Sequence, residues 1–373
     1  MKDLVVNFIK FLVFFGVGFT ILYFVFQDQQ KGFQTKCDYD FVELCIKNGA
    51  TRAVCEAKSK PVCSLSEKVI NDFKTVNYFW IIIVMIAFML SNLSRALRWN
   101  MLIHPLGYPV KLFNTFWATM AGYFANMALP RMGEVVKPGL VSRYEKVPLE
   151  TLMGTIVVDR ILDVIMLLGL IGLTFLLELD RIWEFVSSSA VPGGGGITSL
   201  LTNKWVLLTG VLGVVVLIAL LVFRKKLVET ALFKKLKTIL LGFWEGILSI
   251  RKLENPILFI FHTLFIWLMY YLMTYLCFFA FAPTANLPLL AGLTVFVFGG
   301  LGMVIPAPGG MGSYQYLVTQ ALILYGVDGD NAFSFSMIIF VTVSFCNIFF
   351  GIISLILLPI YNKSREIDSN TTS

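Results

Sequence analysis

The sequence predicts an all-α protein that crosses a membrane several times, and three observations support this fold class. First, 57% of the 373 residues are hydrophobic and only 14% are charged, whereas about a quarter of the residues in a soluble domain are charged. Second, long apolar runs recur along the chain, and a helix needs roughly 20 such residues to cross the hydrocarbon core. Third, proline and glycine interrupt two of these runs. We therefore expect about six full spans and two re-entrant hairpins, about eight membrane segments in all.

The first apolar run, at about 5–26, predicts a retained first span. Lys2 and Lys10 give it the basic start of a secretory signal. However, the run is roughly 20 residues long and lacks a small-residue cleavage site. Residues 1–26 are therefore assigned to a transmembrane helix and not to a cleaved leader.

Residues 27–75 are polar and predict an extracytoplasmic loop that carries disulfide bonds. Its cysteines are Cys37, Cys45, Cys55 and Cys63, spaced C-x7-C-x9-C-x7-C. This symmetric spacing suits two short antiparallel helices with nested bridges, Cys37 to Cys63 and Cys45 to Cys55, although the other pairings stay open. Disulfides form in oxidising compartments, so the alternative is a cytosolic loop of reduced thiols. Because the spacing is not C-x2-C and the chain has only two histidines, His104 and His262, no metal site is expected. No nucleotide-binding motif is visible, and no cofactor is expected.

The distribution of basic residues indicates the topology of the transmembrane domain at 76–360. The segment 224–255 is basic and amphipathic, which is typical of an interfacial helix on an anionic lipid surface. Cytoplasmic loops gather Lys and Arg, so this segment is expected in the cytoplasm. It can lie there only if the run at 112–143 enters from the cytoplasm and returns to it as a re-entrant hairpin. Both termini, including the tail 361–373, are then cytoplasmic, in a plasma membrane or a bacterial-type inner membrane.

Each predicted hairpin has a break at proline and glycine. The sequences MALPRMGE at 127–134 and MVIPAPGG at 303–310 both read Met-x-x-Pro-x-x-Gly. Proline removes a helix donor and glycine frees the backbone, so a helix is expected to stop at both places. Paired breaks of this kind in two inverted repeats indicate the central site of a transporter. The residues assigned to the second break are Pro306, Pro308, Gly309, Gly310 and Gly312.

Charged residues follow the first break. They are Arg131, Glu134, Lys137 and Arg143. With the freed backbone amides, Arg131 and Lys137 could hold an anionic headgroup while Glu134 keeps Arg131 oriented. The alternative is an ordinary solvated cytoplasmic loop.

Three more charges interrupt the next apolar run. Asp159, Arg160 and Asp163 each cost on the order of 2.5 to 3.5 kcal/mol in mid-membrane unless they are paired. Arg160 lies three residues before Asp163 and can bridge to it, so the alternative reading is a structural ion pair. We expect this cluster, the charges after the first break and the glycines of the second break to line one polar cavity. Arg95 and Arg98, which end the second span, are expected to be an interfacial anchor.

Four motifs together resemble the transmembrane region of the lysylphosphatidylglycerol synthase/flippase family. In chain order they are Arg95-Ala-Leu-Arg98-Trp99, Asn126-x-x-Leu-Pro130-Arg131-x-Gly133-Glu134, Arg160-Ile-Leu-Asp163 and Pro306-Ala-Pro308-Gly309-Gly310-x-Gly312. The resemblance covers about 75–360 and implies a flippase-like lipid translocator whose headgroup site includes Asn126 and Pro130. The cysteine loop departs from the family, and Lys137 stands where the family commonly has Arg. The cytosolic aminoacyl transferase domain of the best-known members is expected to be absent.

The leading hypothesis is therefore a lipid translocase or lipid-binding transporter, and not an enzyme. Its substrate would be a membrane phospholipid or lipid-linked molecule with a phosphate-bearing, anionic or modified headgroup. One alternative is an accessory subunit that presents lipid to a separate transferase. Another is an intramembrane lipid-modifying enzyme that uses Glu134, Asp159 or Asp163 as acid or base. The net charge of +7 reflects topology and not nucleic-acid binding.

Overall fold

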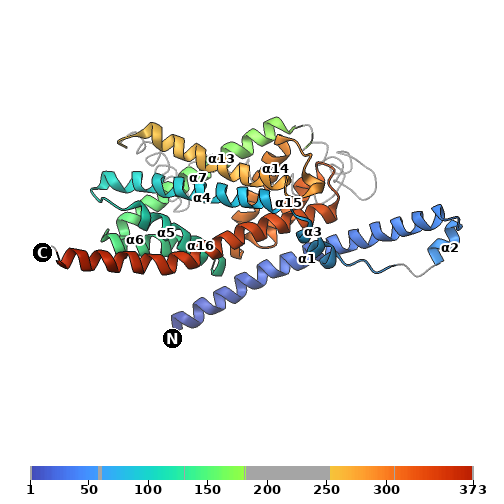
Figure 1. Cartoon of the computed structure of the whole chain (residues 1–373), viewed down its shortest axis with the longest axis horizontal. Helices are drawn as coiled ribbons and strands as arrows, with labels where there is room; N and C mark the ends of the chain where they lie inside the picture. Colours follow the sequence, from blue (N-terminus) through green and yellow to red (C-terminus); the bar gives the residue numbers. More distant parts are fainter. Residues whose placement is uncertain are drawn as a thin grey trace, which may run out of the picture. The chain divides into compact units, whose positions relative to one another are not determined.

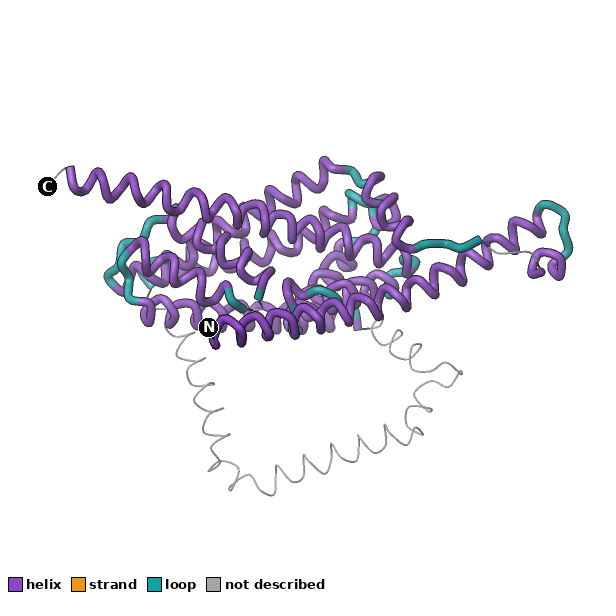
Figure 2. The backbone as a smooth tube through the Cα atoms, turned by 90° about the horizontal axis from the view of Figure 1, so that it is seen from below, coloured by secondary structure: helices purple, strands orange, loops and turns teal. Residues whose placement is uncertain are grey.

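The computed structural model describes residues 2–57, 61–129, 131–179, 181, 253–305 and 307–371. Within these ranges all the regular elements are helices, in agreement with the predicted all-α class (Figures 1 and 2). The chain divides into two compact units, Met1–Val157 with Ile257–Ser373 and Val158–Pro256, and each is described by itself. The predicted interfacial helix at 224–255 lies almost entirely outside the described residues, as does the apolar run at 205–223.

Four helices in the described part of the chain are long and apolar enough to cross a membrane. They are α4 (Tyr78–Ile103), α7 (Leu149–Leu177), α13 (Pro256–Phe278) and α16 (Gly329–Thr371). Large apolar side chains cover the outside of these helices. For example, Ile82 of α4 and Ile356 of α16 are more than half exposed. Such a surface suits contact with lipid tails.

The predicted first span and the start of the cysteine loop form one element. Helix α1 runs without interruption over Lys2–Lys47, so it continues well past the expected boundary at residue 26. Gln and Lys are good helix formers, so the polar stretch after residue 26 does not end the helix. Helix α1 is not among the four apolar candidates.

After α1 the chain turns back through two short helices, α2 (Arg52–Ala57) and α3 (Leu65–Thr75). The structure pairs Cys37 with Cys63 and Cys45 with Cys55, which is the nested arrangement indicated by the spacing. The chain turns back between Lys47 and Arg52, inside the loop closed by the inner disulfide.

Two pairs of short helices occur where the sequence predicts hairpins. The first pair is α5 (Leu112–Ala128) and α6 (Gly133–Glu145), and the second is α14 (Leu289–Val304) and α15 (Ser313–Ile323). A short 3-10 helix, η4 (Pro308–Gly310), lies in the second break. Long helices precede and follow each pair, α4 and α7 around the first, α13 and α16 around the second. The order long, short, short, long is therefore repeated.

One helix of each short pair packs on α16, α5 from the first pair and α15 from the second (Figure 1). Aromatic rings join this helix to its neighbours. Phe88 of α4 stacks on Phe350, with ring centroids 6.3 Å apart, and Phe278 of α13 lies 5.1 Å from Phe335. Because one helix supports both pairs, their breaks are brought into the same part of the unit.

Candidate functional site

The first break, at 129–132, is closed by its own hydrogen bonds. Asn126 Oδ1 accepts the N–H of Gly133 at 2.7 Å. The N–H of Glu134 donates to the carbonyl oxygen of Arg131 at 3.1 Å, and that of Val135 donates to Met132 at 3.0 Å. The expectation that freed backbone amides bind an anion here is therefore wrong for these three amides. Tight i to i+3 bonds at the start of α6 already use two of them.

Helices α5 and α6 meet backbone to backbone beside this break. A Cβ atom on Gly133 would lie 2.7 Å from the carbonyl carbon of Gly122 and 2.8 Å from Asn126 Oδ1. No Cβ fits at such distances, so residue 133 must be glycine for the helices to approach this closely. Gly133 is thus a packing residue, and Asn126 supports the break from inside.

The charged residues that follow the first break occupy different environments. Arg131 and Arg143 are exposed, whereas Glu134 is partly buried. Arg131 also adopts a left-handed backbone with φ 64°, which is uncommon for a residue other than glycine and occurs often at functional sites. The neighbouring Pro130 lies outside the described residues. Of the predicted headgroup ligands, Arg131 is the basic side chain that the break itself presents to the surface.

Lys137 lies inside the protein, only 4% exposed. Its Nζ atom sits 4.0 Å from the ring centre of Trp99, at the distance of a cation–π contact. Trp99 is itself fully buried and donates from Nε1 to Thr155 Oγ1 at 2.9 Å. Lys137 therefore joins α6 to α4 from inside the protein, whereas Arg131 is exposed at the surface.

A buried polar layer that was not predicted from the sequence lies between α4 and α13. Arg95 and Arg98 are 3% and 0% exposed, so their assignment as an interfacial anchor is wrong. Arg98 Nη1 donates to Thr263 Oγ1 at 3.4 Å, and Ser94 Oγ lies 2.8 Å from His262 Nδ1. The guanidinium of Arg95 lies 5.9 Å from the ring centre of Tyr270.

A signal for this layer is present in the sequence. Ser91, Arg95 and Arg98 recur at intervals of four and three and so share one face of the helix. Polar residues on one face of a membrane helix face the protein interior.

The second break, at 305–312, is built like the first. Gln315 Oε1 accepts the N–H of Gly312 at 2.7 Å, as Asn126 does for Gly133. A Cβ on Gly302 would lie 2.8 Å from the Cα of Tyr314, so α14 and α15 also meet at a glycine. Gly309, Gly310 and Gly312 have φ angles of 59°, 75° and 85°. Pro308 lies in η4, and Pro306 lies outside the described residues.

The two breaks meet at Met127 and Gly309. A Cβ on Gly309 would lie 3.1 Å from the sulfur of Met127, and one on Gly310 would meet the sulfur of Met303. Met127 and Met303 open the two copies of the repeated motif. The corresponding ends of α5 and α14 thus converge on the glycines of the second break.

The predicted intramembrane charges belong to the second unit. Asp159 is buried, with 1% exposed. Arg160 Nη1 and Asp163 Oδ2 lie 3.6 Å apart, and these side chains are 40% and 13% exposed. The ion pair indicated by the spacing is therefore present.

These features define a class: helical membrane proteins with a repeated pair of broken helices. Residues 65–351 match the family described as the lysylphosphatidylglycerol synthase TM region, and the chain belongs to this family. The resemblance carried by the four motifs is confirmed, and the chain is an integral membrane protein.

A UPF0104 membrane protein of Methanocaldococcus jannaschii is 30% identical over 100 residues, which are 26% of this chain and 30% of that protein. The aligned part thus spans less than a third of the relative's length. No solved structure matches the chain. Helices α1 and α2 precede the family region, which begins at the first residue of α3.

Proposed function

We propose that this protein is a flippase-like lipid translocase, or a lipid-binding transporter, for lipids with a phosphate-bearing, anionic or modified headgroup. The observation that carries this proposal is the meeting of two broken helix pairs at Met127 and Gly309. Irregular backbone at membrane depth is tolerated only where it is buried in protein or lines a water-filled cavity. Broken helices in two related halves commonly form the substrate site of transporters.

We further propose that both pairs are re-entrant and that the pairs are inverted copies. Each pair folds back on itself. Asn114 Nδ2 at the start of α5 donates to Glu145 Oε1 at the end of α6, at 2.5 Å. In the second pair, Thr294 Oγ1 lies 2.9 Å from the Tyr325 hydroxyl.

The outer ends of the two pairs lie at opposite ends of α16. Asn114 also exchanges hydrogen bonds with Asn362, at 2.9 Å, near the C-terminal end of α16. Tyr325 closely precedes Asp328, just before α16 begins. These two ends are separated by about 50 Å of helix, enough to span a bilayer. This arrangement supports entry of the two pairs from opposite sides of the membrane. The proposal includes eight membrane segments, and both termini in the cytoplasm as the distribution of basic residues indicates.

Within this scheme Arg131 makes the main contact with the headgroup. It is exposed and follows the first break directly. Glu134 keeps the Arg131 side chain oriented. Lys137 adds positive charge from the protein interior, where its contact with Trp99 holds α6 on α4. Asn126 shapes the break through its bond to Gly133.

A second candidate function is an accessory subunit that presents lipid to a separate transferase. The observation in its favour is the exposed apolar surface of the arm formed by the C-terminal end of α1 and by α2 (Figure 2). Tyr39, Leu44 and Val54 on this arm are each more than half exposed, and a partner protein could cover them. Such a protein would bind the same lipid and depend on its partner for any reaction.

Bound lipid tests the binding half of the proposal. Native mass spectrometry of the purified protein should find a co-purified lipid with a phosphate-bearing headgroup. Arg131→Ala should weaken its binding roughly tenfold to hundredfold, because a charge-assisted hydrogen bond contributes about 1.5 to 3 kcal/mol. Arg52→Ala, an exposed arginine of α2, is the control and should bind normally. Equal binding by both variants would contradict the assignment of Arg131.

A further inference from the structure

Gly312, the last residue of the second break, lies against the backbone of α1. A Cβ on Gly312 would lie 2.7 Å from the carbonyl oxygen of Gly18 and 2.7 Å from the amide nitrogen of Leu22. It would also lie 2.8 Å from the Cβ of Ile21. Only a glycine allows such an approach, so α1 directly covers this end of the break.

Apolar packing continues the contact toward the disulfide bonds. The rings of Phe26 in α1 and Phe333 in α16 have centroids 6.0 Å apart. Val25, Leu65 and Val69 are buried with Phe333 in one cluster, so α1, α3 and α16 pack together here. Gln30 Oε1 accepts the N–H of Leu65 at 2.8 Å and ties α1 to the start of α3.

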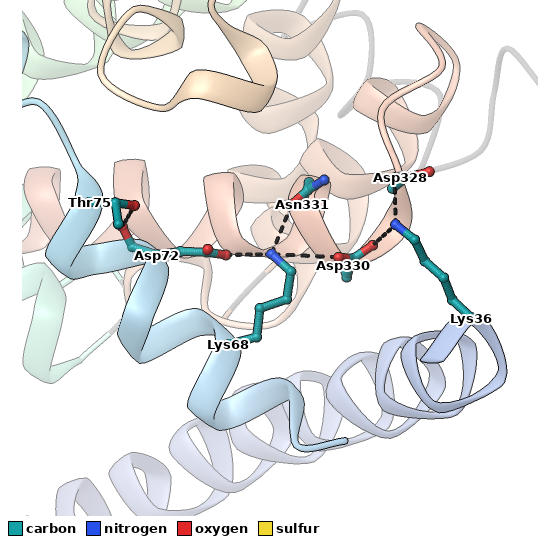
Figure 3. Close-up of polar contacts among 7 residues, drawn as sticks. All are labelled: Lys36, Lys68, Asp72, Thr75, Asp328, Asp330 and Asn331. Atoms are coloured by element: carbon teal, nitrogen blue, oxygen red, sulfur yellow. Dashed lines mark hydrogen bonds and ion pairs between the residues drawn. The ribbon is translucent and has the colours of Figure 1, made fainter. Parts of the chain in front are cut away.

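Beyond this cluster a network of charges, which we call the outer clamp, holds α1 and α3 to α16 (Figure 3). Lys36 Nζ lies 2.6 Å from Asp328 Oδ2 and 3.4 Å from Asp330 Oδ1. Lys68 Nζ lies 3.5 Å from Asp330 Oδ2 and 2.7 Å from Asp72 Oδ2. Asp330 is 5% exposed and is shared by the two lysines.

The outer clamp thus fixes α1 at Lys36, and the disulfide from Cys37 to Cys63 lies next to this residue. The N-terminal part of α1 meets the second break through Gly18. The first break differs, because Arg131 and Met132 are both exposed, whereas in the second break Gly310 and Gly312 are buried and Ile305 is exposed. Helix α1 therefore covers the Gly312 end of the second break, and the end at Ile305 stays at the surface.

We propose that α1 is a gate over the second break, with the outer clamp as its fixed end and the Gly18–Gly312 contact as its closed position. Movement of the N-terminal part of α1, which includes Gly18, away from Gly312 would uncover this end of the second break. This inference rests on the proposed function, because the gate acts on the passage of lipid. It assigns a transport role to a helix that lies outside the family region.

Cross-linking across the gate tests the proposal. In Phe26→Cys/Phe333→Cys, a short reducible bis-thiosulfonate reagent would tie α1 to α16 in its closed position. The matched control is Arg52→Cys/Glu56→Cys, whose residues lie within α2 and form an ion pair at 2.9 Å. Leaflet exchange of a fluorescent anionic phospholipid in liposomes and lipid binding are both measured, before and after the reagent.

We expect the tied gate to slow exchange at least tenfold and to leave lipid binding unchanged. The control should keep its rate, and reduction should restore exchange to the level of the reduced control. Exchange at the unreacted rate in the tied protein would overturn the gate and leave α1 as an anchor. Absence of exchange in every untreated protein would overturn the proposed function, and the gate with it.

A second variant tests the closed contact without a reagent. Gly312→Ala should push α1 away and raise the rate of thiol labelling at Ile21→Cys at least tenfold. Gly107→Ala is the control, because Gly107 has a matching φ of 87° but no neighbour within 4 Å of a Cβ. Equal labelling rates in the two backgrounds would overturn the closed contact.

Discussion

The two broken helix pairs share one backbone design but differ in charge. In both pairs the helices meet at a glycine, Gly133 in the first and Gly302 in the second. In both, a side-chain oxygen accepts the N–H at the start of the second helix, from Asn126 or from Gln315. However, Arg131, Glu134, Lys137 and Arg143 follow the first break, whereas no charged residue occurs from 283 to 327.

The difference indicates that the fold of the two pairs and the charge at their breaks depend on different residues. The repeated glycines give both pairs the same tight fold, so each can end in an irregular break. Only the first pair places basic groups at its break, and the second instead presents glycines to Met127 and α1. A headgroup would therefore be recognised at the first break and pass the second without a fixed charge to hold it.

The largest expected effect tests the shared backbone design. Gly133→Ala and Gly302→Ala should each destabilise the fold by about 1 to 3 kcal/mol or more, because a Cβ would overlap backbone atoms across the pair. Thermal unfolding in detergent measures the loss. Gly139→Ala in α6 is the control. It has no neighbour within 4 Å and should be neutral or stabilising, because alanine favours a helix. If one pair tolerates its alanine, the two pairs are not built alike.

The next effect concerns the side chains that support the breaks. Asn126→Ala and Gln315→Ala should cost about 1 to 3 kcal/mol each, because each leaves a backbone N–H without its acceptor. Equilibrium unfolding of the two variants measures the cost. A loss in only one variant would show that water or another group satisfies the other break.

Much of this arrangement could be predicted from local sequence. The two breaks follow from proline and glycine, and the nested disulfides and the Arg160–Asp163 pair follow from spacing. Each depends on residues close together in the chain or on a regular pattern.

What the sequence did not predict depends on contacts between distant segments or on local geometry. Arg95 and Arg98 end a span, but the packing of α13 buries them. The polar stretch of α1 after residue 26 forms helix by its own propensity, but its position beside α3 and α16 depends on the distant contacts of the outer clamp. After the first break, the amide of Gly133 is satisfied by Asn126, a side chain in the last turn of α5, and the next two amides by tight local bonds. A sequence motif does not reveal these bonds.

The smallest effect concerns the outer clamp, which holds α1 beside the second pair. Burial lowers the pKa of Lys36, but the hydrogen bond to Asp328 and the charges of Asp330 and Asp328 together outweigh it and raise the pKa above its ordinary 10.5. The stabilisation is therefore complete below the ordinary pKa and is lost as pH rises through the raised value. Because the side chain is 42% exposed, the effect should stay below about 1 kcal/mol.

Thermal unfolding at pH 8 and pH 11 checks this expectation. The stability difference between the wild-type protein and Lys36→Met should be present in full at the lower pH and be smaller at the higher one, because pH 11 lies above the ordinary pKa of 10.5. An equal difference at pH 8 and pH 11 would show that Lys36 acts through packing and not through charge.

The measurement that tests the account most directly is leaflet exchange by the purified protein in liposomes. A fluorescent phospholipid with an anionic headgroup is placed in one leaflet, and its transfer is followed for the wild-type protein, Arg131→Ala and empty liposomes. We predict that the wild-type protein accelerates exchange without changing the lipid chemically, and that Arg131→Ala falls roughly tenfold to hundredfold toward the empty liposomes. No acceleration by the wild-type protein, or equal rates for the wild-type protein and Arg131→Ala, would contradict the account.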